Sequence, residues 1–285
     1  MYKLSIENQY GDSLIFNQLG GAYSVVDAEG LDPVEADINT TQTALYDGGS
    51  ITSKKLQTRT INLAFAIEYS AEHYRLEAYK VCHVKKPVTI RYKSNLRDVY
   101  IEGVVQNFKV TLFEMKQIAT VTILCPFPYW KQAQEMVDEL SDIINRFHFP
   151  FASTEEPQLV MGEINMVNSI YINNNGSAEC GMTIELYAID TVTDPKVYNY
   201  ITQEFIGLNV SMQAGDLITI CTEPGNKTVT LLRNGVITNL FNYVMEDSTW
   251  LQLDIGGNEF VYTVETGDPT DLFVTFRHHA LFEGV

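Results

Sequence analysis

The residues best suited to catalysis or metal binding are scattered along the sequence. His278 and His279 are adjacent, but neighbouring residues of a strand point to opposite faces and cannot easily share one ion. His73 and His83 lie ten residues apart in a predicted helix, with no nucleophile and carboxylate at matching spacing. Phosphate-binding and dinucleotide-binding glycine motifs are absent from the sequence. We therefore predict a non-enzymatic protein with no catalytic residue, cofactor or metal site.

Carboxylates are numerous enough to hide a glycosidase pair. Glu163, Glu185, Asp254 and Glu259 fall in predicted strands of the second half. Abundance is a weak signal, because acidic side chains at the edge of a sheet are usually solvated. A cell-wall hydrolase is therefore a third hypothesis, behind the two developed below.

One aromatic residue has polar neighbours at strand spacing. Trp250, Gln252 and Asp254 alternate along a predicted strand, which places all three on one side of it. An exposed indole with such neighbours is suited to binding a sugar ring, whereas a tryptophan in a sandwich more often packs in the core. A carbohydrate-binding adhesin that contacts host cell-wall sugar is the alternative hypothesis.

The four cysteines, Cys82, Cys125, Cys180 and Cys221, are widely separated and lack zinc spacing. They are typical of small buried hydrophobic residues in a reducing compartment. The start of the sequence does not look like a signal peptide, and no apolar run reaches 18 residues. We expect a cytosolic, soluble product that does not enter membranes.

The charge of the chain is concentrated in its second half. The net charge is -17; residues 1–150 hold 15 Lys and Arg against 18 Asp and Glu, and residues 151–285 hold 4 against 18. An acidic second half repels phosphate backbones, so we predict no direct binding of nucleic acid. A length of 285 residues favours two domains.

The first half predicts strands with one packed helix. Period-2 alternation marks strands at 2–6, 87–92, 98–110 and 116–126. Residues 71–83 predict a helix, with Ser70 as its N-cap and with Tyr74, Ala78 and Val81 on one face.

A long hairpin arm is predicted at about residues 35–66, around the turn Asp47-Gly48-Gly49. Its two strands are rich in threonine and carry too little apolar surface to be stable alone. We expect the arm to lie against another surface. The candidate residues of an oligomer interface are Asp47, Gly48, Gly49, Ile51 and Arg59.

Prolines at 126 and 128 end the first unit at about residue 130. Met136, Leu140, Ile143 and Phe147 recur at helical spacing and predict a helical connector over 131–150. Residues 151–285 then alternate short strands with turns such as Asn234-Gly235, which predicts an antiparallel sandwich.

Several short motifs occur in a fixed order along the chain. The first half contains Arg59 to Leu63, Lys86-Pro87 and Cys125 to Trp130; the second contains Asn174 to Gly176, Ala214 to Asp216, Asn234-Gly235 and Ser248 to Leu253. Together they resemble the siphovirus-type distal tail proteins of bacteriophages over most of the chain.

This resemblance implies a mainly β fold: a β-barrel or sandwich-like tail-ring domain at 1–130, the connector, and a galectin-like β-sandwich at 151–285. It also implies a homo-oligomeric, hexameric ring hub in the virion tail, assembled in the bacterial host cytoplasm. The ring would join the tail tube protein to tail-tip, tape-measure or receptor-binding proteins. The arm would reach over the adjacent subunit, although the connector is longer and more helical than the resemblance implies.

Overall fold

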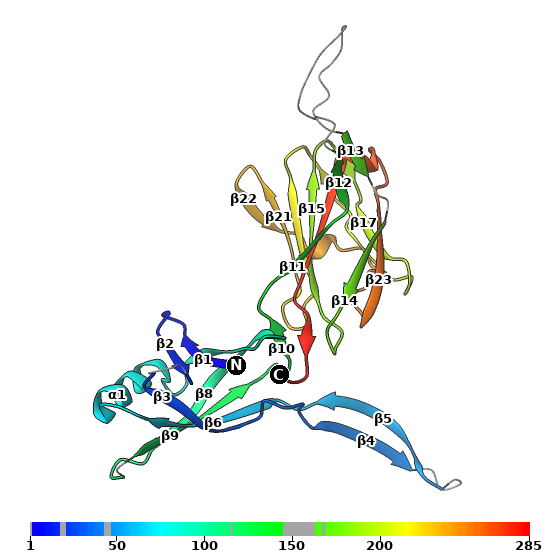
Figure 1. The fold of residues 1–285 in the computed structure, drawn as a ribbon. Helices are drawn as coiled ribbons and strands as arrows, with labels where there is room; N and C mark the ends of the chain where they lie inside the picture. The colour runs from blue at the N-terminus through cyan, green and yellow to red at the C-terminus, as the bar shows by residue number, and fades with distance from the viewer. Residues whose placement is uncertain (1, 18–20, 43–46, 115, 145–162, 167–168) are drawn as a thin grey trace. The chain divides into compact units, whose positions relative to one another are not determined.

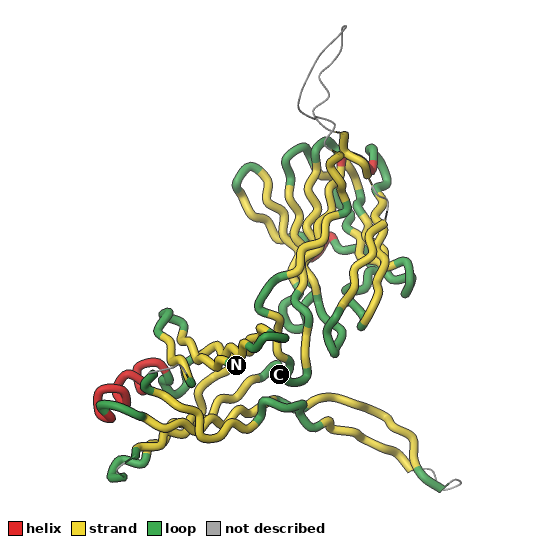
Figure 2. Tube along the Cα trace, in the orientation of Figure 1, coloured by secondary structure: helices red, strands yellow, loops and turns green. Residues whose placement is uncertain are grey.

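A computed structural model describes residues 2–17, 21–42, 47–114, 116–144, 163–166 and 169–285, with the backbone alone at 141–144 and 163–166. The chain forms two compact units. Unit 1 comprises residues 1–134 and 281–285, and unit 2 comprises residues 135–280. Strands make up most of the regular structure of both units, which confirms the mainly β prediction (Figure 2).

Unit 1 is built on a nine-stranded antiparallel sheet whose main path runs β2-β1-β7-β8-β9-β6-β3, with β10 paired to β8 and β25 paired to β10. The two ends of this path meet, since the Asn17 amide donates to the Tyr23 carbonyl at 3.0 Å. The strands of unit 1 are β1 Lys3–Asn8, β2 Ser13–Phe16, β3 Tyr23–Glu29, β4 Ala36–Gln42, β5 Gly49–Leu56, β6 Arg59–Ile67, β7 Pro87–Lys93, β8 Asp98–Val110, β9 Gln117–Cys125, β10 Trp130–Gln132 and β25 Leu281–Phe282.

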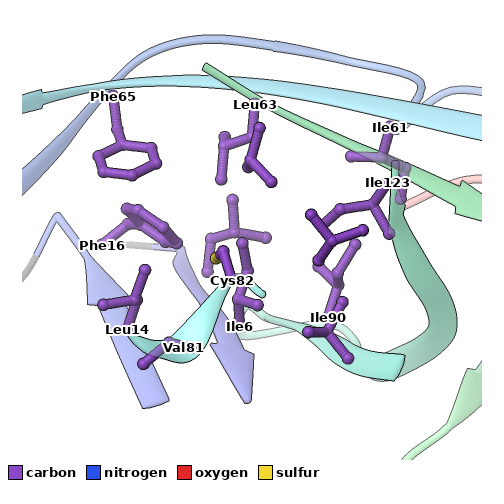
Figure 3. Packing of buried hydrophobic residues seen from close by; sticks show 14 of the residues in the cluster. Ile6, Leu14, Phe16, Ile61, Leu63, Phe65, Val81, Cys82, Ile90 and Ile123 are labelled. Carbon is purple, nitrogen blue, oxygen red and sulfur yellow. The ribbon is translucent and has the colours of Figure 1, made fainter. Parts of the chain in front are cut away.

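The core of unit 1 lies inside this curled sheet and beneath α1 (Ala71–Val81) (Figure 3). Phe16 and Phe65 contact each other with ring centroids 5.0 Å apart. Ala78 and Val81 are buried on the inner face of α1, as its apolar spacing predicts. Ser70 differs from expectation: it has left-handed backbone angles, with φ 35°, and its side chain makes no capping hydrogen bond.

Unit 2 contains two principal antiparallel sheets, of order β11-β24-β15-β20-β21-β22 and β14-β23-β17-β18. Residues facing inward alternate with outward ones along the strands; Phe260 and Phe276, one from each sheet, have ring centroids 5.0 Å apart. The strands of unit 2 are β11 Met136–Glu139, β12 Ser141–Ile144, β13 Glu163–Met166, β14 Ser169–Asn174, β15 Met182–Ala188, β16 Val192–Thr193, β17 Lys196–Asn199, β18 Phe205–Gly207, β19 Ser211–Met212, β20 Leu217–Cys221, β21 Thr228–Arg233, β22 Val236–Asn239, β23 Gly256–Thr263 and β24 Leu272–His278. Two short 3-10 helices lie at Phe241–Tyr243 and Pro269–Asp271.

The helical connector predicted at 131–150 is wrong for the residues that the structure describes. β10, β11 and β12 occupy this stretch, and Met136 pairs with His278 of β24. Long-range strand pairing therefore overrides the helical spacing of the apolar residues. Residues 145–150, including Phe147, lie outside the described residues.

The chain crosses between its units twice, because residues 281–285 return to unit 1. In this return segment (Leu281–Val285), Leu281 pairs with Lys131 and Phe282 pairs with Trp130. Unit 2 is therefore inserted between two neighbouring strands of unit 1, whereas the sequence predicts two successive domains divided near residue 130.

All four cysteines are free thiols. Cys82, Cys125 and Cys180 are buried, and this burial raises the pKa of each thiol to about 12. Within the described residues, no helix combines the length and the apolar character needed to cross a membrane.

Candidate assembly interface

The arm consists of β4 and β5, which form a two-stranded sheet of their own (Figure 1). Apart from the partly covered Asp37 and Leu56, every side chain of these two strands lies on the surface. No other described strand pairs with either edge of this ribbon. Each outer edge therefore exposes backbone donors and acceptors that a further strand could satisfy.

A β-bulge brings two isoleucines to one face of the arm, which also carries Lys54, the direct partner of Ile38. Opposite Asn39 and Thr40, the partners in β5 jump from Ser53 to Ile51, which leaves Thr52 unpaired. This jump brings Ile51 to the same face as Ile38, where the two side chains are 55% and 53% exposed.

The opposite face of the arm is polar. The Lys55 ammonium lies 3.7 Å from the Asp37 carboxylate, and the Asn39 side-chain amide donates to the Ser53 hydroxyl at 2.9 Å. Such exposed pairs contribute little to stability, but they distinguish the two faces of the ribbon chemically. A partner would bury the isoleucine face.

The predicted turn lies at the tip of the arm. Asp47 and Gly48 form a bend just before β5, which begins at Gly49. Gly48 has φ +97°, a conformation that L side chains rarely adopt, and no neighbouring atom lies within 4 Å of the position of an added Cβ. A side chain at position 48 would therefore be disfavoured by the backbone conformation, although there is open space for it. Residues 43–46 lie outside the described residues.

Arg59 does not belong to an exposed interface, and residues 59–66 of the predicted arm instead form part of β6, inside the main sheet. The Arg59 side chain is buried, and its guanidinium donates to the carbonyls of Gly30 at 2.6 Å, Asp32 at 2.7 Å and Pro128 at 2.7 Å. It also donates to the carbonyl of Glu283. Burial lowers the pKa of Arg59, but a guanidinium stays protonated in proteins.

Two sequence families match the chain in the order of its units. The "Phage tail protein RIFT-related domain" matches residues 11–125, and the "Siphovirus-type tail component, C-terminal domain" matches residues 175–279. The chain also aligns with the crystal structure of the SPP1 Dit protein, at 13% identity and a TM-score of 0.67, over 98% of this chain and 99% of that one. This chain belongs to the siphovirus-type distal tail protein family.

Further similarity is to the phage P2 baseplate in its activated conformation. With Ca, the match has 15% identity and a TM-score of 0.54, and with Sr it has 14% identity and a TM-score of 0.53. Each covers all of this chain and all of the other. None of the curated protein sequences compared with the chain matches it significantly. At these identities the solved structures support the fold that the distal tail protein family shares.

The predicted sugar-binding residues of this family member lie on an irregular segment and not on a regular strand. Leu251 and Leu253 are buried, so the intervening Gln252 and the flanking Trp250 do point outward as the alternation predicts. The Trp250 ring stacks on Phe241 with centroids 5.4 Å apart.

Trp250 and Gln252 already make contacts within the chain that a bound sugar would have to replace or share. The Lys227 ammonium lies 5.3 Å from the Trp250 ring centroid, and the Gln252 amide donates to the Thr222 carbonyl at 2.9 Å. Asp254 is exposed. Carbohydrate binding at Trp250, Gln252 and Asp254 stays a prediction.

Of the two adjacent histidines, His278 is buried and His279 is partly buried. Neither ring nitrogen of His278 has a hydrogen-bond partner in the described part of the chain; Nδ1 lies 3.8 Å from the Asp138 carboxylate. Burial lowers the pKa of His278 more than the nearby Asp138 raises it. Among the described residues, no cluster of three or more His, Cys, Asp or Glu could hold a metal ion.

The four carboxylates considered for hydrolysis do not form a described pair. Glu185 binds Arg277 at 3.1 Å across neighbouring strands of the six-stranded sheet, whereas Glu259 belongs to β23 in the other sheet. Asp254 precedes β23, and the Glu163 side chain lies outside the described part of the chain. The hydrolase hypothesis gains no support from these positions.

Sequence reasoning missed two features of the interface. The bulge at Thr52 and the exposed Ile38 give the arm its apolar face, and the only available signal was a pair of isoleucines in a polar run. The return segment was also missed, because its partners are more than one hundred residues away in the sequence.

Proposed function

We propose that this chain is the subunit of a closed ring in a phage tail, in which the arm of each subunit is completed by the next subunit. The observation that carries the proposal is the arm itself: a ribbon whose edges pair with no other described strand, with an exposed Ile38 and Ile51 on one face. An isolated two-stranded ribbon is at best marginally stable in water.

Addition of the arm to a neighbouring subunit would satisfy its backbone and bury the two isoleucines at once. The contact joins different surfaces of two copies and is therefore head-to-tail. When the rotation from one subunit to the next closes on itself, such contacts form a ring and not a filament. Asp47, Gly48 and Gly49 would lie at the far end of this contact.

The family supports a structural role in the tail, and the finer assignment is part of our proposal. We infer a hexamer that acts as a hub between the tail tube protein and tail-tip, tape-measure or receptor-binding proteins. The SPP1 Dit protein, which this chain resembles in fold, has been described as a paradigm of the hub adsorption apparatus in phages that infect Gram-positive bacteria. The hub role requires specific surfaces and no turnover of a substrate.

The test is the mass of the assembled protein. We expect the full chain, concentrated and examined by mass photometry and negative-stain electron microscopy, to form six-fold rings of about six times 32.2 kDa. The double variant Ile38→Asp with Ile51→Asp should remain monomeric, because charges on the apolar face oppose its burial.

A matched control uses an exposed apolar pair in unit 2. Val236 and Ile237 of the edge strand β22 are 64% and 72% exposed, and their replacement by Asp should leave the rings intact. The proposal is wrong if the wild-type chain stays monomeric at high concentration and on purified tail tubes while its arm amides are already protected from exchange.

A further inference from the structure

We propose that the return segment, together with Arg59, is a positioning element that fixes the root of the arm and is required for ring assembly. The arm root is defined as residues 30–35 and 57–58, which connect β4 and β5 to the main sheet of unit 1. The inference concerns a part of the chain distant in sequence from the arm, and its assembly consequence rests on the proposed ring function.

Arg59 links three other segments of the backbone to its own strand at the arm root. Its guanidinium donates to Gly30 and Asp32, which precede the arm, to Pro128 before β10, and to Glu283 in the return segment. All four acceptors are carbonyls, so no carboxylate is among the hydrogen-bond partners that the structure describes for this buried cation. A planar guanidinium can hold several acceptors in fixed directions, which a lysine ammonium cannot do.

The return segment reaches the same place through its own backbone. The Val285 amide donates to the Leu31 carbonyl at 3.3 Å. Gly284 lies against Pro33, whose Cδ would be 3.0 Å from an added Cβ. Leu31 and Pro33 both belong to the arm root, so the return segment contacts the irregular segment that leads into β4.

The return segment is in turn held by unit 1. Phe282 pairs with Trp130 of β10, and the Arg97 guanidinium carbon lies 4.6 Å from the centroid of the Phe282 ring. Arg97 also donates to the Gly284 carbonyl. The segment is therefore anchored on the main sheet at one end and on the arm root at the other.

Among the described residues, few other backbone contacts fix the arm root. Gly30 approaches β6 closely, since an added Cβ would lie 2.1 Å from the Thr60 carbonyl oxygen. Beyond that point, the Gln57 amide donates to the Glu35 carbonyl at 3.2 Å and closes the base of the hairpin. Between these two contacts, Leu31 also packs against the core of unit 1, and Asp32 and Pro33 are contacted by Arg59 and the return segment. A fixed root lowers the conformational entropy lost when the arm docks on a neighbour.

The experiment compares the wild-type chain with a variant that lacks Glu283–Val285. Hydrogen exchange followed by mass spectrometry reports the arm root, and mass photometry reports the rings. We expect amides of the arm root to exchange about tenfold faster in the deletion variant, with a reduced population of rings. Arg59→Lys should produce the same two changes, because it keeps the charge but loses the fork of donors.

Arg277→Lys in β24 is the control, because Arg277 is bound to Glu185 at 3.1 Å within unit 2, whereas Arg59 and the return segment belong to unit 1. It should leave exchange and ring formation unchanged. Wild-type protection of the arm root in the deletion variant would overturn the proposal, as would undiminished rings. If the wild-type chain forms no rings, the ring hypothesis fails by itself, and exchange at the arm root still decides whether the return segment positions it.

Discussion

Asp216 of unit 2 shows how a single buried charge can be stabilised by hydrogen bonds. Its carboxylate is 2% exposed, accepts from Arg233 Nε at 2.9 Å and accepts from the Gln213 amide at 2.7 Å. The hydrogen bonds from Arg233 lower the pKa of Asp216. A lowered pKa in the folded state means that the ionised carboxylate stabilises unit 2.

Asp216→Asn should therefore lower the free energy of unfolding of unit 2 by about 2 kcal/mol at pH 7, because charge-assisted hydrogen bonds are lost. The stabilisation is present above the unfolded pKa of about 3.9 and is lost as pH falls through the lower folded value. Urea denaturation between pH 7 and pH 3 should show the two proteins converging on the acid side. A constant difference across this range would contradict the assignment.

The burial of His278 predicts that the stability of unit 2 also depends on pH in a higher range than the one set by Asp216. Its lowered pKa means that the folded state keeps the ring neutral, so stability is present above the unfolded pKa of about 6.5 and falls as pH drops below it. His278→Leu should raise the free energy of unfolding by about 1 kcal/mol at pH 7, because two unpartnered ring nitrogens are removed. It should also flatten the stability profile between pH 5 and about pH 7. Urea denaturation of the variant and of the wild-type chain at pH 5 and pH 7 provides the measurement. A variant less stable than the wild-type chain at pH 7 would mean that the His278 imidazole has a hydrogen-bond partner in solution.

At the scale of elements, the bulge in the arm has a consequence that can be tested by changing chain length. Insertion of one serine between Asn39 and Thr40 gives Thr52 a partner, restores regular pairing and turns Ile51 to the face opposite Ile38. We expect this insertion to shift rings towards monomers while the melting temperature of unit 1 stays within about 1 °C, because the arm strands contribute nothing to its core. Deletion of Thr52 is the control: it also restores regular pairing but leaves Ile51 paired with Thr40 on the face of Ile38, and it should keep the rings. Rings that survive the insertion would show that the isoleucine face is not buried in them.

Elements with local signals were predictable from the sequence. Strand β8 has the predicted bounds of 98–110, and the apolar face of α1 is the one that Tyr74, Ala78 and Val81 define. The alternation and the helical spacing of these segments agree with their tertiary partners, so local and global preferences point the same way.

Elements that depend on distant partners were not predictable. Met136 and Leu140 have helical spacing, yet Met136 belongs to a strand because His278 pairs with it from the other end of unit 2. Arg59 stands in a polar run and was predicted to be exposed, whereas the carbonyls that bind it come from segments that only the fold brings together. A single sequence carries no signal for such partners.

At the scale of the whole molecule, the chain passes from unit 1 to unit 2 and back, and this path predicts which pieces of the chain fold alone. Unit 2 begins and ends on neighbouring strands, since Met136 pairs with His278, and residues 135–280 should therefore fold when excised. Residues 1–134 lack β25 and the Glu283 acceptor of Arg59, and they should unfold at least about 5 °C lower than unit 1 in the full chain.

The matched control restores unit 1 by joining Gln134 to Leu281 through a short Gly-Ser linker. Because Lys131 and Leu281 are paired, such a linker closes a hairpin without strain, and it should recover the lost stability. Thermal unfolding followed by circular dichroism compares the full chain, residues 1–134 alone, and unit 1 rejoined by the linker. Equal melting temperatures with and without residues 281–285 would show that the return segment is dispensable to unit 1.

The insertion of one unit within the other also sets the order of events during synthesis. The ribosome makes the arm early, but the carbonyl of Glu283 and the amide of Val285 emerge only after all of unit 2 has been translated. If those groups hold the arm in position, a nascent chain cannot join its neighbours prematurely on a polysome. The late synthesis of these residues would then delay assembly until unit 2 has been translated.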